Sequence, residues 1–330
     1  MDQPVSTRAD YTMTARTWSL LILLGAIWGG SFFFARVAVQ HLPPITLVLL
    51  RLGLAAIALH VYIAGRFGLY ATLRQRWREF LAMGLINNVV PHILIFTGQT
   101  EIGAGLAAVL NATTPIFTVL IANQLTADEK MTPAKVAGCL VGLAGTAVLV
   151  GPRALAPFAG DSGGPPLWAL LLPLAAAASY GFAGTYGKRF RNVAPPVTAA
   201  GQITAAAIVL LPLACIVDQP WTVPVPSLGV VLAVLALALV STAYAYILFF
   251  RIMAEAGATN TSLVTLLVPP SAIVAGMLFL GEQLSVAASV GIALVLAGLV
   301  ILDGRLLRRM ASPLQPKGVS AESRETAQKR

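Results

Sequence analysis

Polar side chains that can form hydrogen bonds occur in the middle of several apolar stretches of the sequence. Asn87, Asn88 and His92 lie in one such stretch, where Asn88 and His92 are four residues apart and would share one face of a helix. Polar groups are costly in hydrocarbon and tend to face a bundle interior or an aqueous cavity. Their amide and imidazole groups can hold a solute by hydrogen bonds, although hydrogen bonds between neighbouring helices would also account for them.

The same pattern recurs 154 positions later as Ser241, Thr242 and Tyr246. A further amide, Asn111, lies in another apolar stretch, four residues before Pro115. For any one of these residues a structural role is as well supported as a binding role. For the recurring set, the symmetric arrangement favours two polar faces around one central solute site.

Aromatic side chains in the middle of other apolar stretches predict the apolar part of this site. Trp28 and Tyr180 lie too deep in their stretches for the aromatic belt that marks membrane interfaces. Rings combined with amides and hydroxyls suit an amphipathic solute, such as an aromatic or large neutral amino acid. The predicted substrate-binding residues are Trp28, Phe32, Asn87, Asn88, His92, Asn111, Tyr180, Thr242, Tyr244 and Tyr246.

Arg51 is a charged residue inside an apolar stretch, seven positions after Pro44. A buried guanidinium can bind a carboxylate through two parallel hydrogen bonds. The side chain could instead extend to the membrane surface or pair with Glu101. The sequence therefore makes Arg51 a candidate carboxylate contact, with a structural role as the alternative.

Three prolines lie inside apolar stretches, namely Pro115, Pro269 and Pro270. A proline removes one backbone donor and leaves a carbonyl one turn earlier without its helical partner. We expect these residues to serve as hinges in a conformational change rather than as contacts to the solute.

The sequence offers no set of residues suited to catalysis, metal binding or a cofactor. Its three histidines are far apart, and Cys139 and Cys215 fall inside apolar stretches, so neither a metal site nor a disulfide is predicted. No aspartate or glutamate lies in the middle of a stretch, whereas proton-coupled antiporters usually need such a carboxylate. A membrane enzyme is therefore the weaker alternative. Facilitated movement is favoured, with proton antiport of another metabolite or drug-like compound as the alternative.

Ten long apolar stretches must position these residues. Of the 330 residues, 57% are hydrophobic and 11% are charged, whereas a soluble domain has about 25% charged residues. A stretch of about 20 residues suffices for a helix to cross the hydrocarbon layer, where a helix satisfies its own backbone. The predicted transmembrane helices are 18–37, 45–64, 80–99, 104–123, 132–151, 167–187, 197–217, 228–250, 258–280 and 284–303.

The net charge is +9, and the positively charged residues are distributed unequally between the two sides of the predicted membrane. Of the 22 lysines and arginines, all but Arg36, Arg51 and Arg153 lie in the tails and in loops on one side of the predicted membrane. The positive-inside rule therefore places both termini in the cytoplasm. The expected partners are a small-molecule substrate and the lipid bilayer, not nucleic acid, and a homodimer is compatible with the sequence but not required by it.

The ten predicted helices divide into two halves of related sequence. The segment 43–46 (PPIT) recurs as 195–198 (PPVT), and Glu129 recurs as Glu282. Five helices in each half would invert the second half in the membrane, an arrangement typical of secondary transporters with a site between the halves. We predict an all-α integral membrane protein of two inverted-topology five-helix repeats. Its parts are a cytoplasmic tail (1–17), the first repeat (18–151), an external linker (152–166), the second repeat (167–303) and a basic cytoplasmic tail (304–330).

Several of these motifs together resemble the EamA type of the drug/metabolite transporter superfamily, over residues 18–303. They are Trp28-Gly29-Gly30-Ser31-Phe32, Arg51-Leu52, Gly105 to Pro115, Glu129 and Gly281-Glu282. Within that group the chain is most similar to aromatic amino-acid exporters of the bacterial inner membrane. The resemblance implies outward transport by alternating access. It also implies a central cavity lined by predicted helices 1, 3, 4, 6, 8 and 9, with helices 5 and 10 outside it.

Overall fold

The computed structural model describes residues 14–125, 132–159, 165–261 and 264–303, and all regular structure within them is helical. Seven helices are long and apolar enough to cross a membrane, and three shorter apolar helices coincide with the other predicted stretches. The protein is therefore a multi-pass membrane protein. The seven long spans are Ala15–Val39, Pro44–Ile63, Trp77–Gly98, Ala104–Leu125, Leu167–Phe190, Pro195–Val217 and Leu228–Met253, and the shorter ones are Pro133–Val148, Leu267–Leu280 and Ser289–Ile301.

The elements follow one another in a similar order in the two parts of the chain. Those before residue 160 are α1 (Ala15–Val39), α2 (Pro44–Ile63), α3 (Leu69–Gln75), α4 (Trp77–Gly84), η1 (Leu85–Val89), α5 (Val90–Gly98), α6 (Ala104–Asn111), α7 (Thr114–Leu125) and α8 (Pro133–Ala159). Those after residue 164 are α9 (Leu167–Tyr186), η2 (Gly187–Phe190), α10 (Pro195–Val217), η3 (Pro220–Thr222), α11 (Leu228–Leu235), η4 (Ala236–Tyr244), α12 (Ala245–Thr261), α13 (Val264–Leu280) and α14 (Val286–Asp303).

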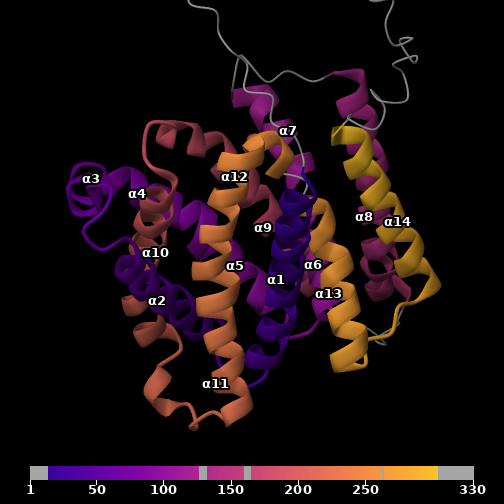
Figure 1. Ribbon diagram of the computed structural model, residues 1–330. Coiled ribbons are helices and arrows are strands. Elements are labelled where there is room, and N and C mark those ends of the chain that lie inside the picture. Colours follow the sequence, from indigo (N-terminus) through magenta and orange to yellow (C-terminus); the bar gives the residue numbers. More distant parts are fainter. Residues whose placement is uncertain (1–13, 126–131, 160–164, 262–263, 304–330) are drawn as a thin grey trace, which may run out of the picture.

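Helices from the two parts of the chain pack against each other throughout the bundle. α1 lies against α13, α2 against α10, and both α5 and α7 against α9. α8 and α14 stand beside this bundle and pack mainly on each other (Figure 1). The core is thus built between the two parts of the chain rather than within each of them.

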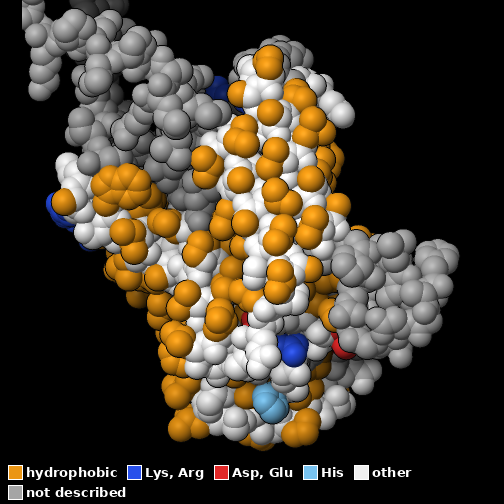
Figure 2. All heavy atoms as spheres, turned by 90° about the vertical axis from the view of Figure 1, so that its right-hand side faces the viewer, with side chains coloured by type: hydrophobic (Ala, Val, Ile, Leu, Met, Phe, Trp, Pro, Cys, Tyr) orange, Lys and Arg blue, Asp and Glu red, His pale blue; other side chains and the backbone are white. Residues whose placement is uncertain are grey.

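Small residues allow α8 and α14 to approach closely. A Cβ atom added at Gly298 would lie 2.5 Å from the backbone nitrogen of Gly142, and one added at Gly145 would lie 2.6 Å from that of Val295. Figure 2 shows hydrophobic side chains over most of the described surface on this side of the molecule. Exposed apolar residues of this kind, such as Leu140 of α8 and Val290 of α14, suit contact with lipid.

Two carboxylates at the predicted external end cap helices of the other part of the chain. Glu282, in the connection between α13 and α14, accepts hydrogen bonds from the N–H groups of Ala104 (2.6 Å) and Gly105 (3.1 Å) at the start of α6. Asp218, after α10, accepts from the N–H and the hydroxyl group of Thr46 in α2 at 2.6 and 2.9 Å. A negative charge at a helix N-terminus satisfies free N–H groups and the helix dipole, so these contacts hold the two parts together.

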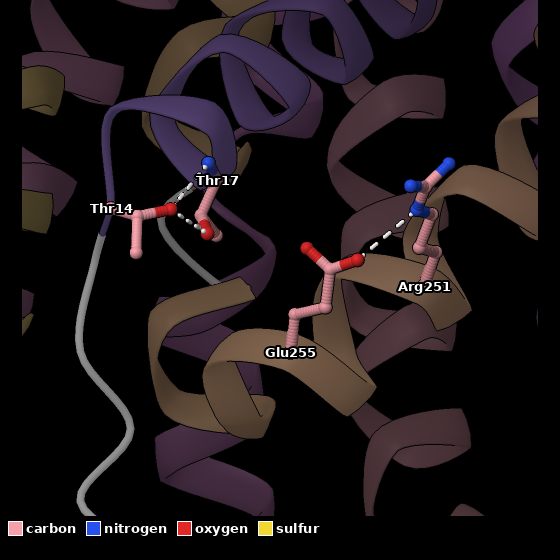
Figure 3. Close-up of polar contacts among 4 residues, drawn as sticks. All are labelled: Thr14, Thr17, Arg251 and Glu255. Carbon is pink, nitrogen blue, oxygen red and sulfur yellow. Dashed lines mark hydrogen bonds and ion pairs between the residues drawn. The ribbon is translucent and has the colours of Figure 1, made fainter.

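The predicted cytoplasmic end carries weaker polar contacts, shown in Figure 3. Thr14 accepts a hydrogen bond from the N–H of Thr17 at 3.1 Å and so caps α1. Arg251 pairs with Glu255 on α12, with 3.1 Å between Nε and Oε1. Because both side chains of this pair are well exposed, it contributes little to stability.

One helix boundary differs from the sequence prediction. Residues 258–261, expected at the start of the ninth transmembrane helix, form the end of α12, because hydropathy marks where lipid contact ends and not where helical hydrogen bonding ends. Of the predicted hinges, Pro115 follows a break between α6 and α7, whereas Pro269 and Pro270 lie inside the continuous helix α13. Glu129 lies outside the described residues.

We predict that Gly298→Ala lowers the free energy of unfolding by about 1–3 kcal/mol, since overpacking forces the α8 and α14 backbones apart. Gly53→Ala is the matched control, because a Cβ atom there would meet nothing within 4 Å, and alanine favours a helix by up to about 1 kcal/mol. Thermal unfolding of the two purified variants in detergent would test this. Equal midpoints would contradict the close packing of α8 on α14.

Candidate functional site

A cavity of about 320 Å³ lies inside the bundle, with walls from both parts of the chain. Apart from α2, which contributes Arg51, its walls come from the elements within predicted helices 1, 3, 4, 6, 8 and 9. No described residue of α8 or α14 lines it. The predicted residues that line it are Trp28, Phe32, Arg51, Asn87, Asn88, His92, Asn111, Pro115, Tyr180, Thr242 and Tyr246. The sequence analysis did not select Ser31, Ile95, Phe96, Ala108, Ala112, Thr114, Thr265 and Val268, which also line it.

Tyr244 lies outside this cavity, and 47% of its surface is exposed. Successive residues of a helix are about 100° apart around its axis. Since Thr242 and Tyr246 face the cavity, the residue midway between them points to the opposite side. The sequence prediction had considered how deep Tyr244 lies in its stretch but not which face of the helix carries it.

The first two residues of each polar set lie where the helix widens from α-helical to π-helical geometry, and His92 and Tyr246 follow in α5 and α12. η1 carries Asn87 and Asn88, and η4 carries Ser241 and Thr242. π-Helical turns often occur at functional sites. Pro91 has no N–H group to donate toward η1, and the hydroxyl of Ser179 on α9 donates to the carbonyl of Ile86 at 2.7 Å. The widened turn is therefore held in part by a side chain from the other part of the chain.

Gln202 of α10 fixes the orientation of the two asparagine amides. Its Oε1 atom accepts hydrogen bonds from Nδ2 of Asn87 at 2.7 Å and from Nδ2 of Asn88 at 3.1 Å. Only 4% of Gln202 is exposed. The sequence analysis missed this residue, although an amide inside the apolar stretch 197–217 was a usable signal.

This arrangement leaves acceptor groups without protein partners. Oδ1 of Asn88 and Oδ1 of Asn111 are buried, and neither has a hydrogen-bond partner among the described residues. Nδ1 of His92 lies 2.7 Å from the carbonyl oxygen of Asn88 and must donate to it, because a carbonyl only accepts. In neutral His92 the other ring nitrogen, Nε2, is then an acceptor as well.

Arg51 is buried, with 7% of its surface exposed. Its Nε atom donates to the hydroxyl of Thr242 at 2.9 Å, and its guanidinium carbon lies 5.7 Å from the ring centre of Phe96. Within the described part of the chain it has no ion-pair partner, so neither a pairing with Glu101 nor an extension to the surface is found. A buried charge is costly without a counter-charge, which favours a role toward the cavity.

The polar contacts of Arg51 and Gln202 across the bundle start from neighbouring positions of the sequence repeat. Arg51 of α2 reaches Thr242 in η4, and Gln202 of α10 reaches Asn88 in η1. Thr242 stands 154 positions after Asn88, while the position that matches Arg51 is Ile203, next to Gln202. Each part of the chain thus contacts the π-helical segment of the other.

Aromatic rings form much of the remaining wall. The His92 ring packs edge-on against Tyr180, with ring centres 6.4 Å apart, and against Phe96 at 6.0 Å. Trp28 packs on Phe249 with centres 5.7 Å apart. Such rings favour a flat or apolar group of a ligand, so the cavity combines aromatic surface with a few polar groups.

Comparison with known proteins identifies the architecture. The model of the EamA-like transporter family matches the chain twice, over residues 16–151 and 167–302. The chain belongs to this family. It is therefore a membrane transporter and not an enzyme, and each match covers one of the two parts of the chain described above.

Several relatives align over nearly their whole length. An "uncharacterized transporter" of Archaeoglobus fulgidus is 26% identical over 87% of this chain and 98% of its own. A "probable terminal-alkyne amino-acid exporter" of Streptantibioticus cattleyicolor is 27% identical over 92% and 98%. A "probable amino-acid metabolite efflux pump" of Salmonella typhimurium is 25% identical over 91% and 99%. One solved crystal structure, 26% identical, superimposes with a TM-score of 0.61 over 91% of this chain and all of its own.

We predict that Gln202→Leu lowers the free energy of unfolding by about 1–3 kcal/mol, because the buried amide of Asn88 and the half-buried amide of Asn87 lose their acceptor. Thr204→Val on the same helix is the control. It removes a buried hydroxyl that has no partner among the described residues, so stability should be unchanged or higher. Thermal unfolding of both variants measures the difference. A Gln202→Leu protein as stable as the Thr204→Val protein would contradict the hydrogen-bond network.

Proposed function

We propose that the protein is a secondary transporter that moves small amphipathic metabolites, most of all aromatic and other neutral amino acids, outward across a bacterial inner membrane by alternating access. The observation that carries this proposal is the cavity between the two family repeats, lined by aromatic rings, neutral amides and one arginine. Its volume is at the lower end of the range of about 300–1,000 Å³ common for small-ligand sites.

In this proposal the chain crosses the membrane ten times, as two inverted five-helix repeats. The twofold family match supports the duplication, and the three shorter apolar helices supply the spans beyond the seven long ones. α1 begins and α14 ends at the same end of the bundle (Figure 1), which agrees with both termini in the cytoplasm. Residues 152–166 would then be an external linker, and the tails 1–17 and 304–330 would be cytoplasmic.

The proposed transport needs no cofactor, metal or proton coupling. Among the described residues that line the cavity, Arg51 is the one permanently charged side chain, and none is an aspartate or glutamate. This supports movement of the solute down its own gradient. Proton antiport of another metabolite or a drug-like compound is the alternative, and it would need a titrating group in the pathway.

The break between α6 and α7 is the proposed hinge. α6 ends at Asn111, α7 begins at Thr114, and Pro115 prevents the helix from closing across this point. Asn111 therefore combines a position in the cavity wall with a position at a flexible joint. In α13, Pro269 and Pro270 would bend the helix without interrupting it.

Liposomes containing the purified protein should take up labelled tryptophan or phenylalanine in a saturable manner without any ion gradient, with threonine as a smaller neutral comparison and empty liposomes as the control. Aromatic amino acids should compete with one another. The facilitated mechanism would be wrong if an imposed pH gradient alone concentrated the solute. Absence of uptake of all three by folded protein would exclude the proposed substrates.

Two aromatic residues of α9, Tyr180 and Phe182, allow a matched comparison between a residue that lines the cavity and one that does not. Tyr180 lines the cavity, whereas Phe182 is 49% exposed on the outer surface. We expect Tyr180→Ala to raise the KM for tryptophan about tenfold, the loss of about 1.4 kcal/mol of aromatic contact. Phe182→Ala should leave KM and the maximal rate unchanged. Equal effects of both substitutions in the uptake assay would place the solute elsewhere.

A further inference from the structure

The cavity contains a positive group that the described protein leaves without a counter-charge. Arg51 uses Nε for its bond to Thr242, and its Nη1 and Nη2 atoms form no hydrogen bond with any described residue. An arginine fork of this kind matches the two oxygens of a carboxylate. Since Arg51 is buried, a ligand that carried a carboxylate would supply the partner that water would give at a surface.

The same cavity contains acceptors that lack a donor. Oδ1 of Asn88 is buried without a partner among the residues described, and the Nδ2 atom of the same amide is already bound to Oε1 of Gln202. Asn111 presents a second such oxygen. An ammonium group has three N–H donors and no acceptor, which makes it complementary to the acceptor oxygens of residues that line one cavity.

We propose that the site binds free α-amino acids as zwitterions, with Arg51 on the carboxylate and the side-chain oxygens of Asn88 and Asn111 on the α-ammonium. The aromatic wall around Tyr180 then receives the side chain. Gln202 is a positioning residue in this arrangement, because it acts through the orientation of Asn88. The inference rests on the transport function proposed above and adds which two groups every substrate must carry.

Ligands with only one of the two charges fit the site poorly. A monoamine would leave Arg51 without its counter-charge and would bring a second positive charge close to it. A carboxylic acid without the amine would leave the oxygen of Asn88 unsatisfied in a buried site, and sites built for a hydrogen bond strongly reject analogues that lack it. Selectivity for the zwitterion therefore follows from unsatisfied groups rather than from the shape of the cavity.

A set of tryptophan analogues tests this on the unmodified protein. Uptake of labelled tryptophan into proteoliposomes is measured with unlabelled tryptophan, tryptamine, indole-3-propionate or N-acetyltryptophan as competitor. We expect half-inhibition by each analogue to need a concentration about 100-fold higher than for tryptophan. Competition by tryptamine or indole-3-propionate as strong as that by tryptophan would overturn the inference while leaving the transport function intact. No uptake of tryptophan, phenylalanine or threonine by folded protein would instead exclude the proposed substrates, and the inference with them.

Substitutions assign the two charges to their residues. Arg51→Gln should reduce the preference for tryptophan over tryptamine about 100-fold, with Arg51→Lys in between because it keeps the charge but not the fork. Asn88→Leu should reduce the preference over indole-3-propionate and leave the preference over tryptamine high. Because a preference is a ratio within one protein, it does not depend on how much of each variant is folded. Preferences equal to those of the unmodified protein in Arg51→Gln and Asn88→Leu would overturn the assignment.

Discussion

A polar group inside a membrane-spanning bundle must find its partner within the protein, because hydrocarbon offers none. In this protein several of these partners lie in the other family repeat, so the hydrogen bonds connect the two repeats. Arg51 of α2 contacts Thr242 in η4, and Gln202 of α10 contacts Asn87 and Asn88 in η1. Four of these five residues also line the cavity. Some of the contacts that join the two repeats therefore also shape the proposed binding site.

Charged groups in the structure fall into two classes. The carboxylates of Glu282 and Asp218 are satisfied by N–H groups at the starts of α6 and α2, and Arg36 donates to the carbonyl oxygens of Gln99 and Thr100. These charges tie the predicted external ends of helices to one another. Arg51 differs, because within the described chain its positive charge meets only a hydroxyl and an aromatic ring. The capping carboxylates and Arg36 thus join helix ends, whereas Arg51 lines the cavity.

The sequence was sufficient to predict an all-helical membrane protein and to select many of the residues that line the cavity, because hydropathy and the repeat report depth in the membrane directly. Depth in the membrane does not say which face of a helix carries a residue, and Tyr244 lies on the face away from the cavity. Gln202 was missed because its repeat partner is apolar, so a search guided by symmetry passed over it. Pro115 follows a break between α6 and α7, whereas Pro269 lies inside the continuous helix α13, a difference that the presence of proline alone does not predict.

The repeat is unequal at one position that matters, since Arg51 in the first repeat corresponds to Ile203 in the second. If the two repeats were identical, the site would be symmetric. A ligand with two different ends could then bind in two opposite orientations with equal affinity. Because only the first repeat carries an arginine at this position, the two ends of the site differ in charge. A bound molecule would keep the same end toward α2 whichever side of the membrane the cavity faces, so a single orientation would serve the entire transport cycle.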